Sequence, residues 1–279
     1  MTMAFESYNA AATGAVVLTV THAGRDYPAW AQDRLALSMD RVRPLEDRYA
    51  DVLVDMAITG GHRTLIARTP RLVIDLNRAE TDFEARAVSG ARNPASRPSH
   101  RARGGLGLVP ERLGNVQLWR SRVSTADLAE RVVATHRPWH TAVESALAEV
   151  ALREGRAVLL DIHSMPTLTG TYPAQIVIGN RYGASADVLT TETAVELFRQ
   201  TGLRVAVNVP YAGAYMLDRH AQPSRGISAL QIEIDRALYL DSALDRPGHG
   251  VGMIQNLIAQ LADVLDTSNR TASWPLAAE

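Results

Sequence analysis

Short apolar runs alternate with segments of helical periodicity along this chain. Each apolar run has the length of a strand that is buried on both faces. Between these runs, hydrophobic residues recur at the spacing of helices that cover a sheet. The alternation predicts a mostly parallel sheet in a three-layer α/β/α arrangement. The expected strands span residues 15–20, 71–76, 156–162, 204–209 and 229–234, and the expected helices span 45–57, 139–154, 190–200 and 249–266.

The helix expected at residues 139–154 has the clearest boundaries. Thr141 and Glu144 have the spacing of a capping box, and Gly155 supplies a C-terminal stop. Gly202 follows the helix at 190–200 in the same way. Since no internal repeat or linker divides the chain, we expect a single α/β domain over residues 1–279.

One segment departs from this pattern. Residues 85–107 (ARAVSGARNPASRPSHRARGGLG) are rich in Arg, Ser, Gly and Pro and have almost no apolar periodicity. A stretch of this kind, reaching to about residue 110, is either a solvated loop or a functional one. In the functional case it is a lid whose arginines meet an anionic substrate. Its GGLG is not a phosphate loop, because no strand leads into it.

Composition narrows the class of protein. Of the 279 residues, 46% are hydrophobic and 21% charged, which is ordinary for a globular enzyme. The net charge of −1 favours neither nucleic acid nor a membrane surface as a partner. The absence of cysteine excludes disulfides, thiolate metal ligands and a cysteine nucleophile. The chain has no apolar run of transmembrane length and no secretory start, so we expect a cytoplasmic enzyme.

Ionisable residues stand where three of the expected strands end. His22 follows the strand at 15–20, His163 ends the strand at 156–162, and Glu233 lies near the end of 229–234. Ligands of parallel α/β sheets bind beyond the carboxyl ends of the strands, so these groups converge if the strands are neighbours. The alternatives are core histidines with satisfied hydrogen bonds, and a glutamate that pairs with Arg236 or another arginine for stability alone.

Two histidines and a carboxylate are a common catalytic zinc set, in which a fourth position stays open for water. A separate carboxylate then takes a proton from that water, and Glu233, inside an apolar strand, has the environment that raises a carboxyl pKa toward neutrality. The third ligand is left open by residue type alone. Glu46, Asp47 and Asp51 all lie in a segment where a first helical turn also favours acids.

An ordered set of motifs resembles the N-formylglutamate amidohydrolase family. The resemblance runs from about residue 20 to 241 and implies a mixed α/β sheet of the zinc-exopeptidase and amidase kind. The first motif has HAG where family members often have HSG, and the last has EID where many have EIN. The motifs are THAGRDYP (21–28), EDRYADVL (46–53), VIDLNR (73–78), RPWHTAVESAL (137–147), LLDIHSMP (159–166), GNRYGASAD (179–187) and YAGAYMLDRHAQPSRGISALQIEIDRALYLD (211–241).

The resemblance also implies roles for individual residues. It makes His22 and His163 metal ligands, with Asp47 as the third ligand and Asp51 in reserve. Glu233 becomes the residue that activates water. The residues expected to contact the substrate are Arg25, Asn77, Arg78 and His140 from matching motifs, with Arg219 and Arg225 from the turn DRHAQPSRG.

The predicted activity is zinc-dependent hydrolysis of N-formyl-L-glutamate to L-glutamate and formate. The family name connects this reaction with histidine degradation. One alternative is a hydrolase of another small N-acyl amino acid or amide, since the two motif departures change the surroundings of a ligand and of the base. The other alternative is a catalytically silent binding protein of the same fold. The expected partner is a small molecule. The expected cofactor is one zinc ion per chain, with another divalent metal as the alternative, since two histidines and a carboxylate also bind iron or manganese.

Overall fold

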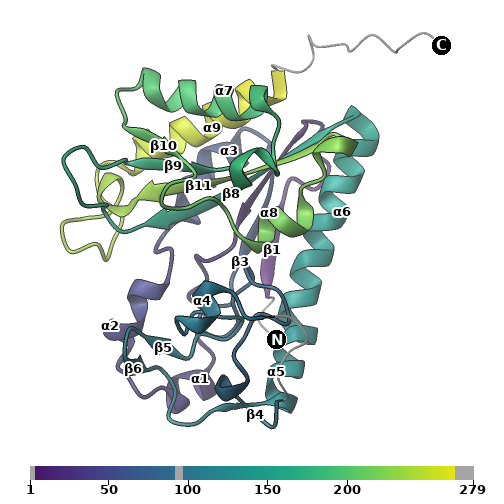
Figure 1. Cartoon of the computed structure of the whole chain (residues 1–279). Coiled ribbons are helices and arrows are strands. Elements are labelled where there is room, and N and C mark those ends of the chain that lie inside the picture. The colour runs from purple at the N-terminus through teal and green to yellow at the C-terminus, as the bar shows by residue number, and fades with distance from the viewer. Residues whose placement is uncertain (1–3, 92–96, 268–279) are drawn as a thin grey trace.

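The computed structural model describes residues 4–91 and 97–267, and a seven-stranded sheet forms its centre (Figure 1). The strand order is β1-β3-β2-β8-β11-β9-β10. Strands β3, β2, β8 and β11 run parallel to one another and β10 runs parallel to β9, whereas β1 and β9 pair with the sheet in antiparallel fashion. The strands are β1 (Phe5–Tyr8), β2 (Val16–Val20), β3 (Arg63–Ala67), β8 (Ala157–Met165), β9 (Ile176–Gly179), β10 (Val205–Val207) and β11 (Ile227–Asp235).

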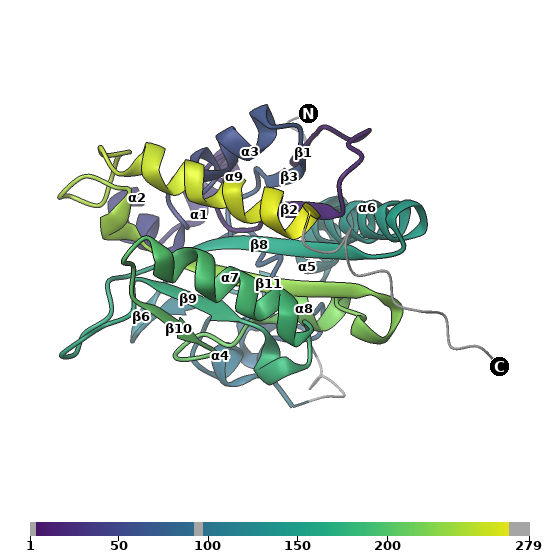
Figure 2. The same ribbon diagram turned by 90° about the horizontal axis from the view of Figure 1, so that it is seen from above.

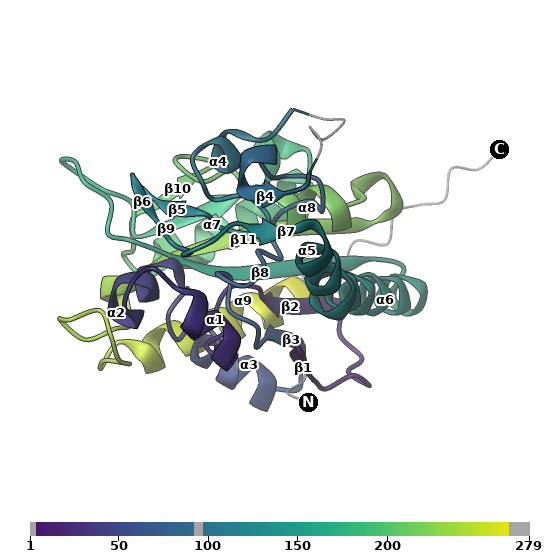
Figure 3. The ribbon, with the colours of Figure 1, turned by 90° about the horizontal axis from the view of Figure 1, so that it is seen from below.

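Helices cover both faces of this sheet, which confirms the predicted three layers. Helices α7 and α9 lie across one face (Figure 2), and α6 runs along the other (Figure 3). Leu18 and Leu160 point into the core under α7 and α9, while their neighbours Val17 and Leu159 point toward α6. The helices are α1 (Ala29–Arg34), α2 (Met39–Val42), α3 (Asp55–Thr59), α4 (His100–Arg103), α5 (Thr125–Arg131), α6 (Arg137–Glu154), α7 (Val188–Gln200), α8 (Tyr215–His220) and α9 (Val251–Thr267). Of the helices in the described ranges, none is long and apolar enough to cross a membrane.

Four of the five predicted strands are confirmed, as β2, β8, β10 and β11. The prediction of a strand at residues 71–76 is wrong. The backbone there folds into turns, in which the amide of Val73 bonds to the carbonyl of Pro70 and the amide of Asp75 bonds to that of Leu108. The apolar side chains of this segment are buried in the hydrophobic core although the backbone forms turns. A run of apolar residues therefore does not distinguish a buried turn from a buried strand.

The helix predicted at residues 45–57 is also wrong over most of its length. The segment consists of 3₁₀ turns at Arg43–Leu45 and Val52–Val54, followed by the short α3. Tyr49 adopts a left-handed backbone, with φ of 56°, which interrupts any continuous helix. Glu46 and Asp47, which precede Tyr49, are buried.

The helix predicted at 139–154 is confirmed as α6, which begins earlier than expected. It continues from α5 through a π-helical segment at Val132–His136, so the N-cap of the whole run is Ser124, whose side chain accepts from the amide of Asp127. Thr141 and Glu144 therefore lie inside the helix, and the predicted capping box is wrong. Gly155 ends the helix in the left-handed region, with φ of 73°, as predicted.

The Arg/Gly/Pro-rich segment contains short elements where the structure describes it. A 3₁₀ turn at Ala85–Ala87 leads into β4 (Val88–Ser89), which pairs with β7 (Val123–Ser124), and α4 follows after Ser99. The hairpin of β5 (Arg112–Leu113) and β6 (Val116–Gln117) comes next. Residues 92–96 of this segment lie outside the described residues.

An ion-pair network attaches α9 to the start of β3 and makes stability depend on pH. His62 Nε2 lies 2.9 Å from Asp263 Oδ1, and His62 Nδ1 lies 3.4 Å from Asp266 Oδ2. The hydrogen bond to Asp266, assisted by Asp263, raises the pKa of His62 above its usual value although burial opposes the shift. A raised pKa means that this stabilisation is complete below the unfolded-state value of about 6.5 and is lost as the pH rises through the folded-state pKa.

We therefore expect His62→Gln to lower the free energy of unfolding by about 1 kcal/mol below pH 6.5. The deficit should shrink in alkaline solution, where the wild-type histidine is neutral. Urea unfolding of both proteins across this pH range measures it, and a deficit that does not change with pH would contradict the assignment. His249→Gln is the matched control, because His249 is exposed.

Candidate active site

The candidate groups converge at the carboxyl ends of three adjacent parallel strands. His163 lies near the end of β8, and Glu233 occupies the position beside it on β11. His22 follows β2 by two residues, on the other side of β8. Because β2, β8 and β11 are neighbours, residues that are more than 200 positions apart in sequence meet at one edge of the sheet.

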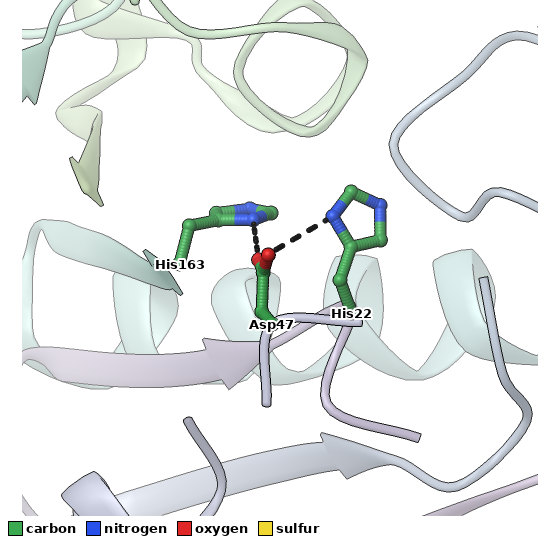
Figure 4. Close-up of side chains that lie close together, drawn as sticks. All are labelled: His22, Asp47 and His163. Atoms are coloured by element: carbon green, nitrogen blue, oxygen red, sulfur yellow. Dashed lines mark hydrogen bonds and ion pairs between the residues drawn. The ribbon is translucent and has the colours of Figure 1, made fainter. Parts of the chain in front are cut away.

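Asp47 completes a cluster of three buried metal-ligating side chains (Figure 4). Its amide bonds to the carbonyl of His22 at 3.0 Å, which fixes the segment after α2 against the end of β2. Asp47 Oδ2 lies 2.8 Å from His163 Nδ1 and 3.6 Å from His22 Nδ1. One ligand atom from each residue falls within 4.8 Å of the others, and all three residues are at most 3% exposed.

The outward nitrogen of each imidazole is held by a second carboxylate. His22 Nε2 lies 2.7 Å from Asp75 Oδ1, and His163 Nε2 lies 2.7 Å from Asp161 Oδ2. Both carboxylates are fully buried and are themselves bonded, Asp75 by Arg71 and Asp161 by the hydroxyls of two threonines. A carboxylate behind each histidine fixes ring orientation and tautomer, an arrangement typical of metal sites.

The electrostatics of this cluster keep its acids ionised. Burial alone would raise the pKa of Asp47, but hydrogen bonds from His163 and His22 hold it well below its usual range. The same balance, with Arg71 and His22 as the main stabilising charges, holds the pKa of Asp75 well below normal. Asp47 is therefore an anionic donor beside two ring nitrogens, and this donor set fits a divalent metal of the zinc type.

Glu233 lies beside this cluster and has a perturbed pKa. Burial raises its pKa to about 7, with His163 opposing the shift and Asp47 adding to it. Its Oε1 accepts a hydrogen bond of 2.7 Å from Gln231 Nε2. Arg236, considered above as an ion-pair partner of Glu233, bonds instead to Ser164 and to the carbonyls of Pro44 and Glu46. Its Nη2 also lies 3.4 Å from Asp47 Oδ1. A carboxyl group that titrates near neutrality can act as base and then as acid.

The cluster opens into a cavity of about 670 Å³, a size typical of small-molecule sites. Its wall includes His22, Asp47, His163 and Glu233. A larger cavity of about 820 Å³, beside α1 and α5, contains none of these groups. Five arginines line the smaller cavity, namely Arg71, Arg78, Arg101, Arg181 and Arg236.

Two of these arginines have guanidinium N–H groups with no hydrogen-bond partner among the residues that the structure describes. Arg71 bonds to Asp75 through Nε alone, so both of its terminal nitrogens are free. Arg101 on α4 makes no hydrogen bond and lies over the ring of Tyr211, with 5.6 Å from Cζ to the ring centroid. Arg78 is more constrained, because Nε and one terminal nitrogen donate to the carbonyls of Leu106 and Asn77. Free guanidinium groups in a cavity are suited to carboxylates.

The structure brings Asn77 and Arg78 to this cavity but not the other residues expected to contact substrate. Arg25 forms a bidentate pair with Asp51, which occupies both the arginine and the reserve ligand. His140 is buried on α6, with Nδ1 2.9 Å from His220 Nε2, and burial lowers its pKa to about 2. Arg219 and Arg225 are directed to Tyr215 and Gln222 and do not line the cavity.

Several groups that shape the site were missed. Asp75 and Arg71 were placed in a strand that does not form, and Asp161 was treated as part of an apolar run. The sequence does indicate that Asp161 lies beside His163. Residues two apart on a strand share a face, and Asp161 precedes His163 by two positions. No motif singles out Arg101, which lies in the segment 85–107, where apolar periodicity is almost absent.

Comparison with known proteins gives a consistent result. Residues 14–240 match the family described as N-formylglutamate amidohydrolase. An N-formylglutamate deformylase of Pseudomonas aeruginosa is 26% identical over 197 residues, 68% of each chain, and one of Pseudomonas putida is 26% identical over 233 residues, 81% of this chain and 82% of its own.

Two solved structures share the fold. The crystal structure of an N-formylglutamate amidohydrolase from Ralstonia eutropha has a TM-score of 0.88 at 25% identity and covers 95% of this chain and 98% of its own. A gene product of Agrobacterium tumefaciens has a TM-score of 0.69 at 21% identity, with 95% of each chain covered. The second likeness concerns the fold alone.

Proposed function

Because the chain belongs to the N-formylglutamate amidohydrolase family, whose members are amide-hydrolysing enzymes, we propose that it hydrolyses N-formyl-L-glutamate to L-glutamate and formate at a zinc centre. The observation that carries the proposal is the cluster of His22, Asp47 and His163 beside Glu233, at the base of an arginine-lined cavity.

His22, Asp47 and His163 would hold the zinc ion, and Asp75 and Asp161 would keep the two imidazoles in their binding orientation. Zinc supplies Lewis-acid chemistry, which makes water acidic near neutral pH and polarises a carbonyl group. Asp51 and Glu46 are not needed as ligands, because Asp51 pairs with Arg25 and Glu46 with Arg48.

Glu233 provides the proton transfers. As water attacks the formyl carbon, the Glu233 carboxylate accepts a proton from it, and the C–O bond forms while the carbonyl becomes a tetrahedral oxyanion. The protonated carboxyl then gives that proton to the amide nitrogen, the oxyanion re-forms the C=O bond as the C–N bond breaks, and glutamate leaves as an amine. The formic acid released transfers its remaining proton to that amine and becomes formate. Glu233 returns to its ionised form, so one water is consumed for each formate released.

Arg71 is the donor best placed for the negative charge that develops on the formyl oxygen. Its Nε is fixed on Asp75, the carboxylate that also holds His22, so its free terminal nitrogens lie next to the cluster. Fixed donors of this kind stabilise an oxyanion without reorganising during the reaction.

The two carboxylates of the substrate need cationic partners at different depths. We assign the α-carboxylate, which lies next to the scissile amide, to Arg78 deep in the cavity. The distal carboxylate is assigned to Arg101, which is exposed on α4 at the cavity wall. Charge-assisted hydrogen bonds of this kind contribute about 1.5–3 kcal/mol each.

Arg101→Gln is expected to remove the preference for an anionic side chain. The kcat/KM value for N-formyl-L-glutamate should fall about 10- to 100-fold, whereas that for the neutral N-formyl-L-glutamine should change little. Steady-state kinetics on the two substrates measure the difference. Arg103→Gln on the same helix is the control, since Arg103 donates to Pro98 and does not line the cavity. Equal losses on both substrates would contradict the assignment.

Formate release from a panel of N-formyl and N-acetyl amino acids, with zinc added, tests the proposed substrate. We expect the highest kcat/KM with N-formyl-L-glutamate. A higher value for another N-acyl amino acid would replace the substrate and keep the reaction, and silence across the panel with zinc bound would favour a binding protein. The expected cytoplasmic location and the connection with histidine degradation stay predictions.

The two motif departures lie beside proposed functional residues, but neither side chain lines the cavity. Asp235 accepts hydrogen bonds from Thr167 and from the amide of Ala237, and it stabilises the turn after β11 without lining the cavity. Ala23 follows His22 directly and is buried, so the missing hydroxyl is close to a proposed ligand.

A further inference from the structure

A chain of buried hydrogen bonds leads from helix α8 to Glu233. The amide of Met216, at the start of α8, donates to Asn77 Oδ1 at 2.8 Å. Asn77 Nδ2 donates to Gln231 Oε1 at 3.2 Å, and Gln231 Nε2 donates to Glu233 Oε1 at 2.7 Å. The three side chains are between 3% and 7% exposed.

The donor-to-acceptor direction of this series of hydrogen bonds is fixed by the groups at its two ends. A backbone N–H group only donates, and a carboxylate only accepts. The carboxamides of Asn77 and Gln231 lie between them, and each has one orientation in which both of its contacts are satisfied. Every hydrogen in the chain therefore points toward Glu233, which makes the chain a one-way relay of donors.

The elements that carry the relay are rigid. Gln231 and Glu233 are two residues apart on β11, so they share a face, and they pair in register with Asp161 and His163 of β8. Asn77 lies in the turn after Asp75, and its own amide bonds to Asp75 Oδ1 at 2.8 Å. The turn that holds the His22 ring thus also holds the relay.

The two oxygens of Glu233 are consequently not equivalent. Oε1 accepts from Gln231, whereas Oε2 has no hydrogen bond from the residues that the structure describes. A proton on Oε1 would face the N–H of Gln231 and displace that bond, so Oε2 is the oxygen free to exchange a proton in the cavity.

We propose that Gln231 and Asn77 are positioning residues, which hold Glu233 by Oε1 and leave Oε2 as the oxygen that takes and returns the proton. This inference rests on the proposed role of Glu233. It also changes the expected role of Asn77, because its carboxamide is engaged by protein at both ends and is not a primary contact of the substrate.

A double-mutant cycle tests the relay by activity. Gln231→Met keeps side-chain length and removes the donor, and Asn77→Asp still accepts from Met216 but cannot donate to Gln231. Each change should lower kcat about 10- to 100-fold with little change in KM or zinc content, and the double variant should be no worse than the poorer single one. Gln200→Met and Asn115→Asp, at exposed positions, are the matched controls.

The contrary result is equally distinct. If Asn77 contacts the substrate directly, Asn77→Asp will raise KM, and its effect will add to that of Gln231→Met in the double variant. That outcome would overturn the relay. So would a fall in bound zinc that accounts for the loss of kcat, because the residues would then support the ligands and not the base.

A second readout is independent of turnover. In ¹⁵N-labelled protein, the side-chain amide signal of Gln231, identified by its loss in Gln231→Met, should be protected from exchange and should shift in both Asn77→Asp and Glu233→Gln. If these shifts occur in a protein that hydrolyses no N-formyl amino acid, the relay stands and the proposed reaction fails. If Asn77→Asp leaves the signal unchanged, the relay is overturned whatever the activity.

Discussion

Glu233→Gln is expected to lower kcat for N-formyl-L-glutamate about 100- to 10,000-fold while zinc stays bound. Glutamine has the size of glutamate and fits the same buried position on β11, but it cannot take a proton from water or deliver one to the amide nitrogen. The three proposed ligands are untouched by the change, so the zinc content of the purified protein should equal that of the wild type.

The measurement combines steady-state kinetics with metal analysis of the same preparation. Glu192→Gln, on the exposed face of α7, is the control for the substitution itself. A Glu233→Gln variant with near wild-type kcat would show that another group moves the proton. A variant that lost both zinc and activity would show that Glu233 supports the metal, and its role as base would need revision.

His163→Ala is expected to weaken zinc binding by more than about 100-fold and to abolish turnover with it. The substitution removes one of three ligands and leaves two buried carboxylates, Asp47 and Asp161, without their shared partner. Asp47 keeps Arg236 and Asp161 keeps two threonine hydroxyls, but loss of the imidazole between them should still destabilise the fold, by up to about 3–5 kcal/mol on the scale of broken buried pairs.

Because destabilisation alone would reduce activity, a milder variant separates the two effects. Asp161→Asn keeps a hydrogen-bonding group behind His163 and should weaken zinc binding about 10- to 100-fold with the fold intact. His249→Ala, at an exposed position, is the control for loss of a histidine. Titration of zinc by calorimetry compares the variants, and stoichiometric tight binding by folded His163→Ala would contradict the ligand assignment.

The parts of the fold that the sequence predicted are those where side-chain periodicity reports directly on burial. Strands β8 and β11 are buried on both faces and read as continuous apolar runs, and α6 and α9 have long periodic patterns. The incorrect elements lie at residues 45–57 and 71–76, where the same apolar content is buried by turns, and strands β1, β3 and β9 were not predicted. A left-handed Tyr49 and a turn that begins at Pro70 leave no mark on hydrophobic spacing.

The cluster at the strand ends was predictable for a related reason. Polar residues at the ends of apolar strands are costly unless they are bonded, so His22, His163 and Glu233 stood out, and strand adjacency brought them together. Only the family resemblance favours Asp47 as the third ligand, since Glu46 and Asp51 are carboxylates in the same segment. In the structure Asp47 lies 2.8 Å from His163 Nδ1, whereas Asp51 pairs with Arg25 and Glu46 with Arg48, so Asp47 stays the proposed third ligand.

The arginines of the cavity show what sequence reasoning does not reach. Arg25 was expected at the substrate and Arg71 was not, while Arg101 was covered only by the alternative that residues 85–107 form a lid with substrate-binding arginines. Which arginine has free donors depends on tertiary partners, such as Asp51 for Arg25 and Asp75 for Arg71. No pattern in the chain encodes those partners, because each pair is set by how separate segments pack.

The most direct test of the central claim is a zinc titration of chelator-treated wild-type protein with N-formyl-L-glutamate as substrate and formate release as the signal. The account predicts negligible turnover without metal. The rate of formate release should then rise linearly with added zinc and level off at about one zinc per chain, as expected for a single three-ligand site. Undiminished turnover in the stripped protein would contradict it, as would a protein that binds zinc at His22, Asp47 and His163 and releases no formate.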